Sequence, residues 1–129
     1  MRTCRLLAIG RLAAGHEPNE LATIVRTLRA RTRQDEVSGG LLFDGELLVH
    51  WLEGDAAAVD AVYRFIQAQP VGSSTRLLLR GVDDGARGHR QWRAGYLEPG
   101  ALEPLVAAAE AGHDAAALFA ALLDRGDAA

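Results

Sequence analysis

The chain has 129 residues, of which 49% are hydrophobic and 24% charged, a balance that suits one globular domain with a single core. Its net charge of −3 predicts no general attraction to nucleic acid or to an anionic membrane, and no apolar run reaches the ~20 residues of a membrane span. The single cysteine, Cys4, excludes an internal disulfide and a cysteine-based metal cluster, and we expect a cytoplasmic location.

The first half of the chain predicts a strand, a helix and a hairpin. The apolar run Cys4–Gly10 indicates a buried strand. From Pro18 to about Arg33 the apolar residues recur at helical spacing, and Pro18 suits a first helical turn. Two apolar runs, 40–43 and 47–52, then flank Asp44-Gly45, which is typical of a β-hairpin turn.

The second half predicts another helix, two strands and a helical tail. Asp55 suits the N-cap of a helix that carries Val59, Val62 and Ile66 on one face. Five further segments follow: a strand over 75–82, a strand over 91–97, a helix over 99–111, a helix over 114–123 with Asp114 as its N-cap, and a fraying end over 126–129.

The order of these elements, β-α-β-β-α-β-β, predicts an α+β fold of the ferredoxin-like, split βαβ type. Both helices of that arrangement cover one face of the sheet. Because the strands are apolar on both sides, the other face must also be covered, and we expect the alanine-rich C-terminal helices to cover it.

Specific residues then connect this order to a known family. The segment Val49-His50-Trp51-Leu52-Glu53-Gly54 resembles the F-x-Q-x-L-E-G hairpin of BLUF domains, which sense blue light with FAD. Val37-Ser38-Gly39 is similar to the family's Ile-Thr-Gly, and Trp92 stands where the family has a tryptophan. The resemblance covers Cys4–Leu97, so we divide the chain into a BLUF-like domain, 1–97, and a C-terminal helical extension packed on the sheet, 98–129.

The resemblance also shows what this chain lacks. The family holds FAD between its two sheet-covering helices, and light sensing there needs a tyrosine hydrogen-bonded to a glutamine. Ala8 stands at the tyrosine position and His50 at the glutamine position. Arg31 replaces an asparagine that holds the polar edge of the flavin ring, and Thr32 replaces a second asparagine beside it.

The remaining cofactor-binding positions are mostly substituted as well. On the second helix Phe65 and Gln69 replace an arginine and an aspartate that contact the FAD tail, and Ala94 replaces a methionine after Trp92. A buried flavin must exchange water for protein partners, and each unsatisfied polar group costs about 1–3 kcal/mol. We therefore expect no normal photocycle and no bound cofactor, with FAD as the alternative cofactor.

These residues imply a BLUF-fold regulatory or interaction protein that signals through a protein partner, a homo-oligomer or a remodelled ligand cleft. The alternative is a FAD-binding photoreceptor with an altered flavin site. We expect no enzyme, because no residue has the neighbours that a nucleophile or an acid–base pair requires, and we expect no metal site, nucleic-acid partner or membrane partner.

Four further features have a structural and a functional interpretation. His50 is either a hydrogen-bonded interior histidine or a ligand-orienting group. Cys4 could approach His50 only if their strands are neighbours. Glu53 and Asp55 are expected to be carboxylates at the positive end of a helix. The arginines at the end of the first helix are expected to form a solvated helix end, with phosphate binding as the alternative (Arg26, Arg29, Arg31 and Arg33).

Overall fold

The computed structural model describes residues 2–12, 18–71 and 74–129. Its strands are β1 (Thr3–Arg11), β2 (Ser38–Phe43), β3 (Leu47–Gly54), β4 (Arg76–Asp83), β5 (Trp92–Tyr96) and β6 (Asp127–Ala128). They form one sheet in the order β4-β1-β3-β2-β5-β6. The first four strands of this order are those of the predicted split βαβ arrangement, with β5 added parallel to β2.

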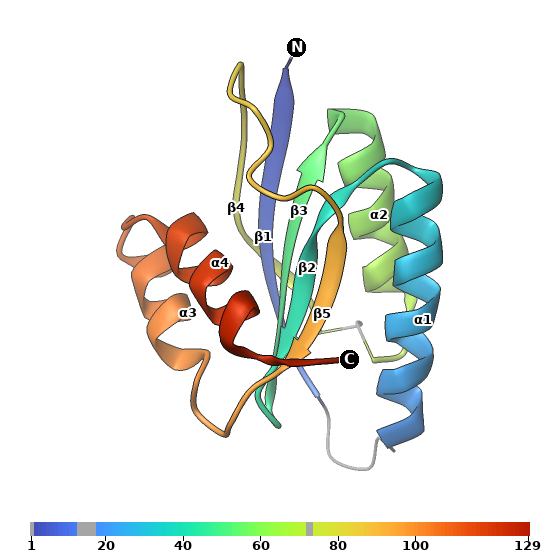
Figure 1. Ribbon diagram of the computed structural model, residues 1–129, viewed down its shortest axis with the longest axis vertical. Coiled ribbons are helices and arrows are strands. Elements are labelled where there is room, and N and C mark those ends of the chain that lie inside the picture. Colours follow the sequence, from blue (N-terminus) through green and yellow to red (C-terminus); the bar gives the residue numbers. More distant parts are fainter. Residues whose placement is uncertain (1, 13–17, 72–73) are drawn as a thin grey trace.

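Helices cover both faces of this sheet, as Figure 1 shows. They are α1 (Pro18–Gln34), α2 (Ala56–Ala68), α3 (Glu103–Glu110) and α4 (Ala115–Arg125). On one face α1 lies over β2 and β5 while α2 lies over β1 and β3, and on the other face α3 and α4 bury a second apolar cluster. Every residue of β3 is buried, because the strand is covered on both sides.

The β2–β3 hairpin is built around Asp44. This buried carboxylate accepts hydrogen bonds from the backbone N–H groups of Glu46 (3.1 Å) and Leu47 (2.8 Å), which closes the turn. Its second oxygen accepts from the N–H of Leu102 (3.2 Å), at the entrance to α3. One side chain therefore fixes the predicted turn and ties the C-terminal helices to it.

Backbones approach each other closely where β2 crosses the centre of the sheet. Gly39 has a φ of 126°, and a Cβ there would lie 1.8 Å from the Trp51 carbonyl oxygen. At Gly40 a Cβ would lie 2.4 Å from the Arg93 carbonyl oxygen. Only glycine fits at either position, which explains the Gly39-Gly40 pair without a ligand.

The structure corrects the expected end of the chain. Residues 126–129 do not fray: β6 pairs antiparallel with β5, and the Ala129 N–H donates to the Ala94 carbonyl (3.2 Å). Helix α3 also begins later than expected, at Glu103, because the chain from Pro99 first makes turns that seat Leu102 in the core. Asp114 caps α4 as predicted, accepting from the Ala116 N–H (3.1 Å).

None of the helices in the described ranges is long and apolar enough to cross a membrane.

Candidate functional site

The centre of the candidate site is a row of residues that crosses the sheet beneath α1 and α2. Ala8 of β1 pairs with His50 of β3, which pairs with Leu41 of β2, which pairs with Ala94 of β5. Side chains alternate along a strand, so these four share the face on which α1 and α2 pack. All four are buried, at 0%, 2%, 2% and 6% exposure respectively. The strands thus bring two of the predicted site positions, Ala8 and His50, into direct register.

His50 is the one polar side chain in this row. Its Nδ1 atom is buried and has no hydrogen-bond partner among the described residues. Burial lowers the pKa of the imidazole to about 4, so the ring is neutral at neutral pH. The predicted hydrogen bond to an interior partner is therefore absent at Nδ1 in the described structure.

Two predicted positions, Arg31 and Phe65, meet between the helices. The Arg31 guanidinium of α1 lies over the Phe65 ring of α2, 5.1 Å from its centroid. Its Nε donates to Asp35 (2.7 Å), four residues later and just after the end of α1. Arg31 therefore has an ion pair and an aromatic contact, which together close this part of the space between the helices.

Thr32 and Gln69 do not join this contact. The Thr32 hydroxyl is fully buried and donates back to the Leu28 carbonyl (2.7 Å) of its own helix. Gln69 follows α2, and its side-chain amide donates to the Phe65 carbonyl (3.3 Å). Both side chains are thus hydrogen-bonded within their own helical segments and not across the space between α1 and α2.

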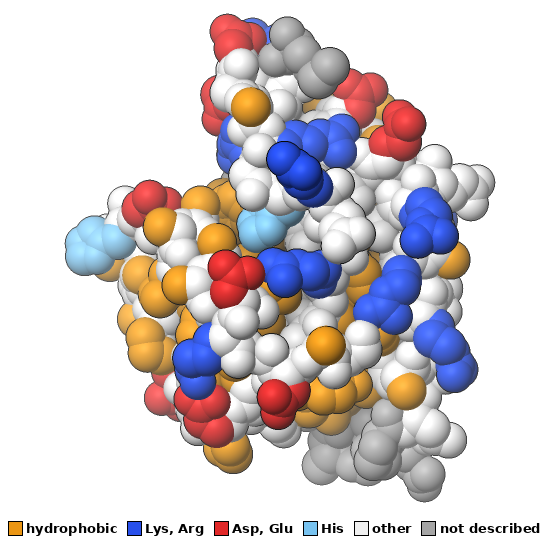
Figure 2. Space-filling model, viewed as in Figure 1, with side chains coloured by type: hydrophobic (Ala, Val, Ile, Leu, Met, Phe, Trp, Pro, Cys, Tyr) orange, Lys and Arg blue, Asp and Glu red, His pale blue; other side chains and the backbone are white. Residues whose placement is uncertain are grey.

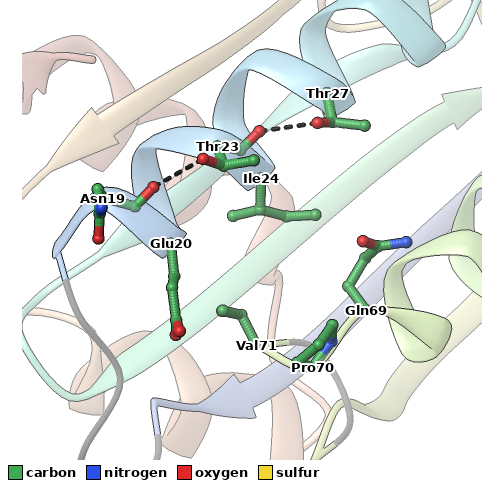
Figure 3. Close-up of a pocket in the computed structure, with 8 residues that line it drawn as sticks. All are labelled: Asn19, Glu20, Thr23, Ile24, Thr27, Gln69, Pro70 and Val71. Atoms are coloured by element: carbon green, nitrogen blue, oxygen red, sulfur yellow. Dashed lines mark hydrogen bonds between the residues drawn. The ribbon is translucent and has the colours of Figure 1, made fainter.

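Gln69 instead lines a small pocket between the first half of α1 and the segment that follows α2 (Figure 3). The pocket has a volume of about 270 Å³, below the ~300–1,000 Å³ typical of ligand pockets. Ile24 of α1 and Val71 after α2 face each other across it. The hydroxyls of Thr23 and Thr27 donate back to carbonyls of α1, both at 2.8 Å.

Trp92, the last predicted position, lies at the start of β5 beneath α1. The Arg29 guanidinium lies over its ring, 5.7 Å from the centroid. The indole is 7% exposed, and its Nε1–H has no acceptor among the described residues. The structure thus places Trp92 on the far flank of α1 from the Arg31–Phe65 contact.

The structure also shows how far Cys4 lies from His50 and how Asp55 sits at the start of α2. Strands β1 and β3 are neighbours, but Cys4 pairs with Gly54, four residues along the strand from His50, or roughly 13 Å at ~3.3 Å per residue. Burial also raises the pKa of the Cys4 thiol, which disfavours the thiolate. Asp55 occupies the N-cap of α2 without a side-chain hydrogen bond to the helix.

Glu53 does not act at the α2 terminus. Its carboxylate is 1% exposed, contacts the Arg5 guanidinium, and accepts from the N–H groups of Gly88 (3.1 Å) and His89 (2.9 Å). It therefore anchors the loop between β4 and β5. Sequence reasoning missed this role because Gly88 and His89 are far along the chain and no local pattern marks them as partners.

Within the described residues no group of three histidine, cysteine, aspartate or glutamate side chains is arranged to hold a metal ion.

The fold and this helix-covered row define a small α+β domain with a sheet covered by helices on both faces. The family described as "BLUF: Sensors of blue-light using FAD" matches residues 5–95, so the chain belongs to the BLUF family. Its members sense blue light with FAD, and the family is one of signalling domains. No curated protein sequence matches the chain significantly.

Solved structures with BLUF domains have the same fold. "BlsA photo-activated state" is similar with a TM-score of 0.77 and 14% identity over 98% of both chains. "BlrB - a BLUF protein, dark state structure" has a TM-score of 0.68 and 22% identity, over 96% of this chain and 93% of that one. A bacterial light-regulated adenylyl cyclase has a TM-score of 0.66 and 17% identity over 97% of this chain. This chain spans only 40% of that cyclase.

The residues present on this face do not fit the ring of the family's FAD. A buried flavin needs polar partners along its ring edge. Here Ala8, Leu41 and Ala94 are apolar, and Arg31 and Thr32 already have partners within the protein. The only unpartnered buried polar atom in the row, among described residues, is Nδ1 of His50.

Proposed function

We propose that this chain is a BLUF-fold regulatory protein that has lost normal flavin photochemistry and signals through a protein partner or a second copy of itself. A cytoplasmic location and the absence of enzymatic activity belong to the same proposal. The family membership supports the signalling role. The apolar, closely packed face beneath α1 and α2 supports the loss of flavin photochemistry.

One observation carries the proposal: Ala8 stands beside His50 in the row beneath the helices. A methyl group can donate neither a proton nor an electron to a flavin. A neutral imidazole donates from one ring nitrogen and accepts at the other, but it cannot present a donor and an acceptor side by side as a glutamine amide does. The Arg31–Phe65 contact further fills the space between α1 and α2.

The surfaces available for a partner are the edge strand β4 and the outer sides of α3 and α4. Within the described residues β4 carries two of the three large exposed apolar side chains, Leu77 at 44% and Val82 at 36%. An edge strand with exposed apolar side chains is suited to pairing with another chain. In this proposal residues 98–129 act as an extension of the 1–97 domain whose outer side is available to the partner.

The test is the visible spectrum of the purified protein after incubation with excess FAD and removal of free flavin, recorded in the dark and under blue light. We expect a colourless protein with no light-induced change. A yellow protein whose flavin band shifts reversibly to the red under blue light would show that the photochemistry is intact.

The second candidate function, a FAD-binding photoreceptor with an altered site, is favoured by a different observation. His50 Nδ1 is a buried polar atom without a described partner, and a pocket opens beside Gln69 on the same side of the sheet. The same spectrum decides between the two functions.

A further inference from the structure

The arginines of this chain fall into two groups. The chain contains 14 basic residues, all arginine. Eight of them form ion pairs: Arg2, Arg5, Arg11, Arg31, Arg76, Arg80, Arg93 and Arg125. The other six form no ion pair with an aspartate or glutamate among the described residues: Arg26, Arg29, Arg33, Arg64, Arg87 and Arg90.

Five of these six arginines gather at one place. A pocket of about 440 Å³ lies between the C-terminal half of α1 and the loop before β5, and its walls include Arg29, Arg33, Arg87 and Arg90. Arg26 lies next to Arg29 and Arg33 on the outer surface of α1. Glu36 is the one carboxylate that lines the pocket within the described residues. Figure 2 shows basic side chains along α1 and around this loop, although the chain as a whole is negative.

Several contacts hold this arrangement in place. Arg29 lies over the Trp92 ring and donates to the Ala129 carbonyl (2.7 Å), and Arg87 donates to the Glu36 carbonyl (2.6 Å). The loop that carries Arg87 and Arg90 is anchored by the buried Glu53. Two guanidinium groups are therefore positioned by the fold, while the guanidinium groups of Arg33 and Arg90 have no hydrogen-bond partner within the described residues.

A solvated helix end explains only part of this pattern. Cations near the C-terminus of α1 are favourable, which accounts for Arg33 and for the bond from Arg87 to Glu36. It does not account for Arg90, or for four guanidinium groups around a single hollow with one carboxylate. Like charges brought together without counter-charges repel each other, so the arrangement is favoured when an anion is bound.

We propose that this pocket binds a small, multiply charged phosphate-bearing anion. Arginine forks match phosphate oxygens in geometry, and several of them around one hollow suit a ligand that carries several charges in a small volume. The hollow is within the size range of small-ligand pockets. It lies beside Trp92, whereas the pocket next to Gln69 lies on the flank of α1 that faces α2, so the two sites are separate.

The experiment is an isothermal titration with inorganic pyrophosphate in a low-salt buffer free of phosphate and flavin. We expect saturable one-to-one binding that weakens as salt is added. Arg33→Gln and Arg90→Gln should each weaken binding about tenfold, the loss expected for one charged hydrogen bond. Glu36→Gln should tighten it, because it removes the carboxylate from the pocket.

The matched control is Arg64→Gln, which removes an exposed, unpaired arginine outside the pocket. Thermal unfolding of each variant checks that it is folded. Affinity that is unchanged in Arg33→Gln and Arg90→Gln, or equally reduced in Arg64→Gln, would contradict the proposal. So would a wild-type protein that fails to saturate with pyrophosphate but binds an oligonucleotide or an acidic protein. No flavin is present, so this result is independent of the photochemical test.

Discussion

The interior histidine is the residue that most clearly distinguishes this protein's helix-covered face from a cofactor site. His50 occupies the middle of β3 with a neutral ring, since its pKa is lowered to about 4 by complete burial. A charged group at this position would have no counter-ion among the row of Ala8, Leu41 and Ala94. The folded state is therefore coupled to the protonation of this side chain.

This coupling predicts an acid-sensitive fold. An unfolded histidine binds a proton near its ordinary pKa of 6.5, whereas the folded one resists protonation down to about 4. The contribution of neutral His50 to the free energy of unfolding is fully present above pH 6.5. It decreases by up to about 3 kcal/mol as the pH falls from 6.5 toward 4. Urea unfolding measures the free energy of unfolding at neutral and at acidic pH. The decrease between the two pH values should be smaller in His50→Leu than in wild type. The exposed His113→Gln variant should lose as much stability as wild type; equal losses in all three proteins would contradict the buried, neutral state.

Glu53 is the second residue whose role is set by burial. Glu53→Ala leaves the Arg5 guanidinium and two backbone N–H groups without their buried partner, so we expect a loss of about 2–4 kcal/mol in the free energy of unfolding. Glu46→Ala is the control, because the Arg11–Glu46 pair is exposed and contributes under about 1 kcal/mol. Chemical denaturation of both variants measures the difference, and a similar small loss in each would rule out the anchoring role.

At the scale of elements, the end of α1 contains a conformation that favours glycine. Glu36 has a φ of 56°, and the Val37 N–H donates to the Thr32 carbonyl (2.9 Å), as in a Schellman motif. A side chain in this left-handed conformation is strained. Glu36→Gly should therefore raise the free energy of unfolding by about 0.5–1 kcal/mol, measured by thermal denaturation. A loss of stability would show that the glutamate side chain has a stabilising contact.

The elements were predictable where the signal is local. Alternation, helical spacing and the Asp44-Gly45 turn predict β1, α1, the hairpin and α2 to within a few residues. The two-residue β6 was missed, because its pairing with β5 depends on a register that only the folded α4 creates. The candidate site was predictable only as a set of positions. Which of them meet depends on side-chain packing, and the contact of Arg31 with Phe65 has no sequence signature.

At the scale of the whole molecule, the sheet separates two apolar clusters, and the second depends on the C-terminal helices. Phe119 of α4 is fully buried, and its ring centroid lies 6.2 Å from that of Trp51 on β3. The helices are thus part of the core and not an appendage. In Figure 1 they lie on the opposite side of the sheet from α1 and α2.

This packing predicts that Phe119→Ala destabilises the whole protein. The cavity and the lost apolar contact should cost about 3–5 kcal/mol, and the tryptophan fluorescence, from Trp51 and Trp92, should report a single cooperative transition shifted to lower denaturant. Leu77→Ala, at a position that is 44% exposed, should change stability far less. An unaffected Phe119→Ala variant would mean that α4 does not contribute to the core.

The central claim is that the face beneath α1 and α2 is a closed, packed interior. It is tested most directly by NMR titration of the labelled protein with FAD, following the methyl groups of Ala8 and Ala94 and the ring of His50. We expect these signals to keep their positions in a large excess of FAD. Large shifts at all three residues, with appearance of bound-flavin signals, would contradict it.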